Sequence, residues 1–113
     1  MIERLRGTSP TRSRAVKHNG LVFAVATAHQ KSPLLYEQAK DVLAQIEATL
    51  VESGSSKSRI LTATIYIADM TAKPELNRAW DEWVDRSNPP LRACIGAALE
   101  GADLVEILVT AAA

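Results

Sequence analysis

The dipeptide Asn19-Gly20 constrains the fold more than any other feature, because it separates two runs of strand-forming residues. Asn-Gly accepts the positive φ angles of a type I′ turn and is the strongest short-range sign of a β-hairpin. The run after the turn, residues 21–26, is apolar at every position. A strand that is apolar on both faces must be covered on both sides. The sequence therefore predicts a hairpin over residues 15–26, with its second strand covered on both faces.

The period of the apolar residues changes after the hairpin. Ser32 is suited to cap a helix, and Pro33 suits the first helical position, where its missing N–H costs nothing. Apolar side chains then recur at helical spacing and form one stripe: Leu35, Ala39, Val42, Leu43, Ile46 and Leu50. Gly54 provides the C-terminal stop. We expect a long amphipathic helix between Pro33 and Gly54.

Three more strands and one more helix follow. Residues 60–67 are rich in β-branched side chains, which favours a strand. In that strand Leu61, Ala63, Ile65 and Ile67 should face the helix, and Ile60, Thr62, Thr64 and Tyr66 the opposite side. The second helix is expected from about Thr71 to Arg86, with its stripe at Leu76, Ala79, Trp80, Trp83 and Val84. Strands at Leu91–Leu99 and Leu104–Thr110 close the chain, and Trp80, Trp83 and Phe23 are expected in the core.

The order of elements, β-β-α-β-α-β-β, predicts an α+β fold in one domain spanning residues 1–113. Right-handed crossovers place both helices on one face of a mixed sheet. The arginine-rich segment 1–14 is interpreted as a solvated arm or an edge strand. The other sheet face is left uncovered although it carries apolar residues: Val16 or its neighbours, Ile60, Tyr66, Leu104 and Leu108. An exposed apolar face of that size predicts self-association.

Charge and composition exclude several classes of protein. Thirteen basic and thirteen acidic side chains cancel, whereas a nucleic-acid binder needs surplus Lys and Arg to neutralise phosphates. No apolar run reaches the roughly 18 residues that a membrane helix needs. The single cysteine, Cys94, permits no internal disulfide. We therefore expect a cytoplasmic protein that binds neither nucleic acid nor membranes.

Arg92 and Glu106 are the candidates for chemistry. Arg92 alternates with Cys94, and arginine is suited to bidentate recognition of a carboxylate. Glu106 lies between apolar neighbours on a predicted strand, where a charge is costly without a partner or water. Exposed strand charges, or a structural ion pair between the two, remain the alternatives. Cys94 is read as a small apolar filler rather than a nucleophile, since no base is placed near it. Two histidines and one cysteine without ligand spacing predict no metal.

Taken together, the ordered segments carry a resemblance to a known family. They are Ser13-Arg14-Ala15-Val16, Asn19-Gly20-Leu21-Val22-Phe23, the helix with Gln38, Leu43 and Ile46 ending in Glu52-Ser53-Gly54-Ser55-Ser56, Ile65-Tyr66-Ile67-Ala68-Asp69-Met70, Asn77-Arg78-Ala79-Trp80, Pro89-Pro90-Leu91-Arg92-Ala93-Cys94 and Leu104-Val105-Glu106-Ile107. In this order and spacing the chain resembles a divergent branch of the RidA family, also called YjgF-type, of imine and enamine deaminases.

The resemblance implies a chorismate-mutase-like fold and a homotrimer with a site in each cleft between subunits. It implies that Arg92 grips the substrate carboxylate and that Glu106 positions or activates the attacking water. Cys94 lines the pocket and Asn77 lies close to it. The implied reaction hydrolyses small 2-imino or enamino acids to 2-oxo acids and ammonia, without a metal or an organic cofactor.

The chain departs from the family pattern at several positions. Arg12 replaces a tyrosine, Ala26 replaces a glycine, Ala93 replaces a small hydroxyl residue, and Gly96 lies where an acid is missing. Two other functions are therefore considered. One is a non-catalytic trimer that binds small carboxylates through Arg92, and the other is a protein of RNA processing or translation.

Overall fold

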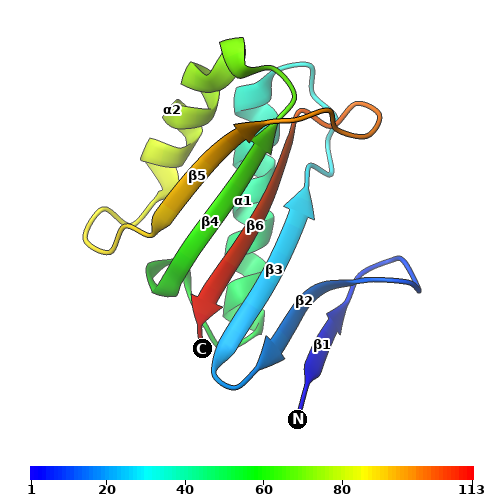
Figure 1. Cartoon of the computed structure of the whole chain (residues 1–113), viewed down its shortest axis with the longest axis vertical. Helices are drawn as coiled ribbons and strands as arrows, with labels where there is room; N and C mark the ends of the chain where they lie inside the picture. Colours follow the sequence, from blue (N-terminus) through cyan, green and yellow to red (C-terminus); the bar gives the residue numbers. More distant parts are fainter.

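A computed structural model describes all of residues 1–113 and shows two helices packed against one six-stranded sheet (Figure 1). The strands are β1 (Glu3–Arg6), β2 (Ser13–His18), β3 (Leu21–Thr27), β4 (Ile60–Ile67), β5 (Leu91–Gly96) and β6 (Val105–Ala112). The helices are α1 (Leu35–Glu52) and α2 (Lys73–Trp83). The strand order is β1-β2-β3-β6-β4-β5, and β4 and β5 form its one parallel pair. Both helices lie on one face of this mixed sheet, which confirms the predicted α+β architecture.

The hairpin forms where the dipeptide predicts it. Asn19 has φ of 51° and Gly20 has φ of 75°, the positive values that a type I′ turn requires at both central positions. His18 and Leu21 pair across the turn. The arginine-rich segment before the hairpin contributes β1, which pairs antiparallel with β2. Of the two interpretations of that segment, the edge strand is the one confirmed.

Helix α1 starts later than predicted and ends as predicted. Its N-cap is Leu34, and the Ser32 hydroxyl accepts a hydrogen bond from the Leu34 N–H in the turn before the helix. At the other end Gly54 has φ of 82°. The N–H of Ser55 donates to the Leu50 carbonyl at 2.8 Å, and that of Gly54 to the Val51 carbonyl at 3.1 Å. These two bonds are the Schellman arrangement that ends many helices at a glycine.

The predicted alternation along β4 holds only from Thr62 onward. The pairing of β4 with β6 shifts between Ile60 and Thr62. A bulge of this kind turns the residues before it to the other face. Ile60 is therefore buried, with 5% of its surface exposed, and Leu61 is 48% exposed. The expectation that Leu61 faces the helix and Ile60 the open side was wrong.

The elements around β5 are shorter than the sequence suggested. A 3-10 turn, η2 (Met70–Ala72), precedes α2, and the helix ends at Trp83 because Val84 adopts an extended conformation. Strand β5 stops at Gly96 instead of Leu99, whereas β6 continues two residues beyond Thr110. No helix in the structure has the length and apolar character needed to cross a membrane.

The core lies between the sheet and the helices, and the opposite sheet face is open. On that open face Phe23 is 45% exposed and Leu108 is 42% exposed. The prediction that Phe23 belongs to the core was wrong, because it alternates with Val22 and Ala24, whose side chains are the buried ones. Trp80 is buried as expected. The apolar open face predicted from the sequence is present, although without Ile60, which is buried, and without Leu104, which packs against the core.

Candidate active site

Arg92 and Cys94 project from the same side of the edge strand β5. Arg92 pairs with Ala63 and Cys94 with Ile65 across the parallel ladder. Because both β4 partners are buried toward the helices, Arg92 and Cys94 lie on the helix side of the sheet. Both are half-buried. The predicted sharing of a face by the two residues is confirmed.

Asn77 and Trp80, one turn apart on α2, border the Arg92 side chain. An Nη atom of Arg92 donates a hydrogen bond to the Asn77 side-chain oxygen at 3.1 Å. The guanidinium carbon lies 5.5 Å from the centroid of the Trp80 ring, within the range of a cation–π contact. A guanidinium carries five N–H donors, so most of its donors remain available to a ligand. The structure therefore holds Arg92 in place without neutralising its charge.

No acid of the chain pairs with Arg92. The ion pairs in the structure join Arg14 to Glu52, Lys31 to Asp103 and Lys40 to Glu37. The alternative in which Arg92 and Glu106 form a structural ion pair is therefore wrong. A half-buried arginine whose partners are an amide and an aromatic ring is suited to bind an external carboxylate.

Glu106 projects from the other face of the sheet. On β6 it lies between Val105 and Ile107, which are fully buried on the helix side. It pairs with Tyr66 on β4 and with Thr27 on β3. Strand β4 separates β6 from β5. One chain therefore does not bring Glu106 and Arg92 together, and a site that uses both needs a second copy of the chain.

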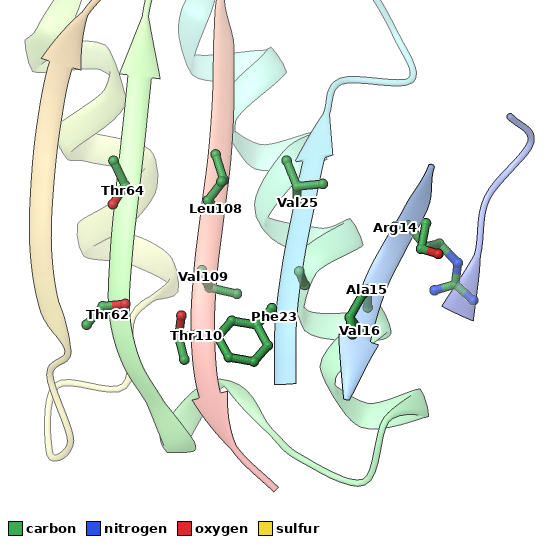
Figure 2. A pocket seen from close by; sticks show the side chains of 12 residues that line it. Arg14, Ala15, Val16, Phe23, Val25, Thr62, Thr64, Leu108, Val109 and Thr110 are labelled. Atoms are coloured by element: carbon green, nitrogen blue, oxygen red, sulfur yellow. The ribbon is translucent and has the colours of Figure 1, made fainter. Parts of the chain in front are cut away.

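The open face near Glu106 is hollowed rather than flat. A depression of about 370 Å³ extends over β2, β3, β6 and β4. Figure 2 shows Phe23, Val25 and Leu108 over this hollow, with Thr64 and Thr110 beside them. The hollow is mainly apolar and holds no charged catalytic pair.

Cys94 has no base beside it in this chain. His18 lies on β2, four strands away from β5, and its ring nitrogen contacts the Met1 carbonyl. His29 lies in the loop after β3. A cysteine nucleophile is normally activated by a neighbouring general base that takes its proton. The geometry favours Cys94 as a small side chain beside Arg92 rather than as a nucleophile. The chain also contains no group of three or more His, Cys, Asp or Glu side chains arranged to hold a metal.

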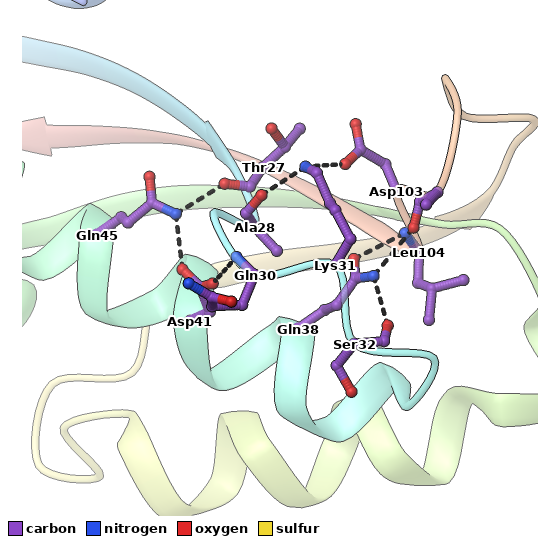
Figure 3. Close-up of polar contacts among 11 residues, drawn as sticks. Thr27, Ala28, Gln30, Lys31, Ser32, Gln38, Asp41, Gln45, Asp103 and Leu104 are labelled. Carbon is purple, nitrogen blue, oxygen red and sulfur yellow. Dashed lines mark hydrogen bonds and ion pairs between the residues drawn. The ribbon is translucent and has the colours of Figure 1, made fainter.

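Gln38 supports the candidate site and was not predicted to do so. It is fully buried on α1. Its amide nitrogen donates to the carbonyls of Ser32 and Ala102 at 2.7 and 3.0 Å, and its oxygen accepts from the Leu104 N–H at 2.9 Å (Figure 3). The side chain thus fixes the loop that enters β6, two residues before Glu106. The available signal was a polar residue on the apolar stripe, between Leu35 and Val42, where a buried amide must find partners.

Asp41 joins the same end of α1 to the loop after β3. Partial burial by itself would raise the pKa of Asp41, but hydrogen bonds from the Gln30 N–H and the Gln45 amide, with a contribution from His29, hold it below its usual value. Gln45 also donates to the Thr27 carbonyl at 2.7 Å (Figure 3). These bonds anchor the end of β3, next to the position of Glu106.

Comparison with known proteins identifies the family. The sequence model of Ribonuc_L-PSP, described as Endoribonuclease L-PSP, matches residues 7–113. The chain belongs to the Ribonuc_L-PSP family, also known as the YjgF or RidA family. It is 42% identical over 113 residues to a RutC family protein of Haemophilus ducreyi, covering 99% of this chain and 97% of the relative. It is 38% identical over 101 residues to the RutC family protein YoaB of Escherichia coli, covering 88% of this chain and 89% of that relative.

Solved structures of the YjgF family share the fold. A YjgF-family protein of Neisseria meningitidis superposes with a TM-score of 0.93 at 41% identity, covering 99% of this chain and 94% of that one. The resemblance drawn from the ordered sequence segments is thereby confirmed. Within this YjgF-type chain, the segment from α2 to β5 holds the arginine, asparagine and cysteine that the resemblance predicted for the pocket, and it holds Arg92 and Asn77 in contact.

Proposed function

We propose that this chain catalyses the hydrolytic deamination of small 2-imino or enamino acids, releasing 2-oxo acids and ammonia and so clearing reactive metabolic intermediates. The observation that carries the proposal is the state of Arg92, which is half-buried, held by Asn77 and without an acidic partner. A planar carboxylate fits such a guanidinium through two parallel hydrogen bonds. Membership in the YjgF family is consistent with this activity.

The chemistry demands little beyond orientation. A protonated imine is already electrophilic, so fixing its carboxylate on Arg92 aligns the carbon for attack. Glu106 accepts a proton from a water molecule whose oxygen bonds to the imine carbon. The proton then passes from Glu106 to the nitrogen of the tetrahedral intermediate. As the C–N bond breaks, Glu106 accepts the proton of the new hydroxyl group, and ammonia leaves a 2-oxo acid behind. General-base assistance of this kind contributes typically about 10²–10⁴-fold.

We further propose that the active unit is a homotrimer with its sites between subunits. Arg92 and Glu106 lie on opposite faces of one sheet, so Glu106 is supplied to the site by a second copy. The exposed Phe23 and Leu108 on the open face support association, because burying them removes apolar surface from water. The net charge of zero opposes self-association little.

The decisive assay measures ammonia released from imino acids that an amino-acid oxidase generates in place. Wild type should accelerate ammonia release above the spontaneous rate, and Arg92→Ala should not. A wild type that binds 2-oxo acids yet leaves the rate unchanged would favour the second candidate, a non-catalytic binder of small carboxylates. That candidate is favoured by the separation of Glu106 from Arg92 within one chain.

The description of the family as an endoribonuclease raises RNA as a substrate. This chain has equal numbers of basic and acidic side chains, and its Trp80 is buried rather than displayed for stacking. RNA binding normally draws on surplus positive charge and exposed aromatic rings. The charge and the burial of Trp80 therefore support an RNA substrate less well than either small-molecule function.

A further inference from the structure

Three positions on the helix side of β5 form a strip that starts at Arg92. Residues two apart on a strand share a face at a spacing of about 7 Å, so Cys94 follows Arg92 and Gly96 follows Cys94. The register places Gly96 opposite Ile67, which is fully buried on the helix side. The strip thus changes along its length from a cation, to a small thiol, to a position without a side chain.

Met70 occupies the space that Gly96 leaves empty. A Cβ built on Gly96 would lie 2.7 Å from Met70 Cγ and 3.5 Å from its sulfur. A contact at 2.7 Å is too short for a real Cβ atom, so any side chain at position 96 would require the Met70 side chain to move. The Met70 side chain therefore lies across the far end of the strip.

The backbone around Met70 is well held, although its side chain remains 45% exposed. The Asp69 carboxylate accepts hydrogen bonds from the N–H and the hydroxyl of Thr71 at 2.9 and 2.6 Å. The Ala68 N–H donates to the Leu104 carbonyl at 3.0 Å, and the Ala97 N–H donates to the Ile67 carbonyl at 3.0 Å. The position of Met70 relative to Gly96 is thus fixed by main-chain bonds, while the unbranched thioether can adapt to what it touches.

We propose that Met70, seated over Gly96, closes the end of the site opposite Arg92 and limits substrates to 2-imino acids with short aliphatic side chains. This inference rests on the proposed function. A ligand whose carboxylate binds Arg92 and whose reacting carbon lies near Cys94 has its side chain directed along the strip. The first methylenes meet apolar surface, and a longer chain collides with Met70.

The test measures binding of three 2-oxo acids, used as product mimics, by titration calorimetry. The probes are pyruvate, 2-oxobutyrate and 2-oxohexanoate. Wild type should bind 2-oxobutyrate about four-fold more tightly than pyruvate, the value of one buried methylene, and should bind 2-oxohexanoate more weakly than 2-oxobutyrate. Met70→Ala should raise the affinity for 2-oxohexanoate relative to 2-oxobutyrate at least about ten-fold, because it removes the obstruction.

Two further variants complete the test. Met70→Gln keeps the length of the side chain and should preserve the wild-type preference for the shorter ligand. Val51→Ala removes an apolar side chain that is 62% exposed on α1 and should change no ratio. An unchanged ratio in Met70→Ala overturns this inference.

The outcome with pyruvate separates the two proposals. If pyruvate binds wild type and loses affinity in Arg92→Ala, while Met70→Ala leaves the chain-length preference intact, only the role of Met70 is wrong. If pyruvate binding does not depend on Arg92, the proposed function itself fails.

Discussion

At the scale of single residues, the side chains that matter most are those whose partners lie far away in the sequence. Arg92 was predicted from its place on a strand and its chemistry, and Asn77 from the family resemblance. The structure places the two in contact. Their environment could not be predicted, because the Trp80 ring beside Arg92 depends on how α2 packs against the sheet. Gln38 was missed for the same reason, since its three partners belong to two loops that come together only in the folded chain.

Replacing Gln38 by Leu should destabilise the protein strongly. The change leaves the Ser32 and Ala102 carbonyls and the Leu104 N–H without their partner in a buried region. Each such loss costs about 1–3 kcal/mol, so the three together should lower the free energy of unfolding by at least about 3 kcal/mol in urea denaturation. The matched control is Gln30→Leu, because the Gln30 side chain is exposed and only its N–H is used. Equal stability of the two variants would refute the role assigned to Gln38.

Asp41 should contribute stability that depends on pH. Its folded pKa is lowered from 3.8 by hydrogen bonds that outweigh its partial burial. A carboxyl group whose pKa is lower in the folded state than in the unfolded state stabilises the protein at pH values above its unfolded-state pKa. That stabilisation is lost as the pH falls through its folded-state pKa. Asp41→Asn should therefore flatten the decline in stability below about pH 4. The control is Asp81→Asn on the exposed side of α2. A decline as steep in Asp41→Asn as in wild type would contradict this assignment.

At the scale of elements, the sequence predicted the type of both α-helices and of the strands β2 to β6. It gave both ends of β4 correctly, but it missed the start of α1, both ends of α2 and the end of β5. Main-chain hydrogen bonds set the ends of α1, and a bulge reversed the first two residues of β4. The local sequence of β4 does not predict this bulge, because the bulge depends on how β4 pairs with β6. Among the helix ends, the one predicted correctly was the stop at Gly54, whose positive φ favours glycine.

Gly54→Ala should test that stop. An alanine at φ of 82° incurs the left-handed penalty, which is about 1–2 kcal/mol, while space for the added methyl exists beside the Lys17 ammonium at 3.5 Å. Thermal unfolding should show a loss of that size. Gly7→Ala provides the comparison, since its added methyl would meet only ordinary contact at 3.9 Å and should leave stability nearly unchanged. A loss of similar size at both positions would argue against the backbone explanation.

At the scale of the whole molecule, one face of the sheet is covered by helices and the other carries exposed apolar side chains. The sequence predicted this asymmetry, because two right-handed strand-helix-strand connections place both helices on the same face of the sheet. It could not predict that Arg92 and Glu106 would face opposite sides, which depends on the register of β5 with β4 and of β4 with β6. That separation is the physical reason for placing the site between copies of the chain.

Leu108→Arg should reduce the proposed trimer to monomers. A charge placed in the middle of a buried apolar contact is costly without a partner, whereas Leu108 is 42% exposed in the single chain, so the fold should survive. Light scattering should give three times the chain mass for wild type and one chain mass for the variant. Val51→Arg on α1 should remain trimeric. A wild type of monomer mass would remove the basis for a site shared between subunits.

The most direct test of the central claim is calorimetric titration of 2-oxobutyrate into wild type and Arg92→Ala, with the melting temperature of each measured in parallel. Charge-assisted hydrogen bonds contribute about 1.5–3 kcal/mol each, so affinity should fall at least ten-fold in Arg92→Ala while the melting temperature stays close to that of wild type. Arg92→Lys should recover only part of the affinity, because an ammonium keeps the charge but not the fork. Equal affinity in wild type and Arg92→Ala would show that Arg92 does not bind the carboxylate. A wild type that binds no 2-oxo acid, together with a much lower melting temperature of Arg92→Ala, would show that Arg92 is structural. Either result would contradict the proposed site.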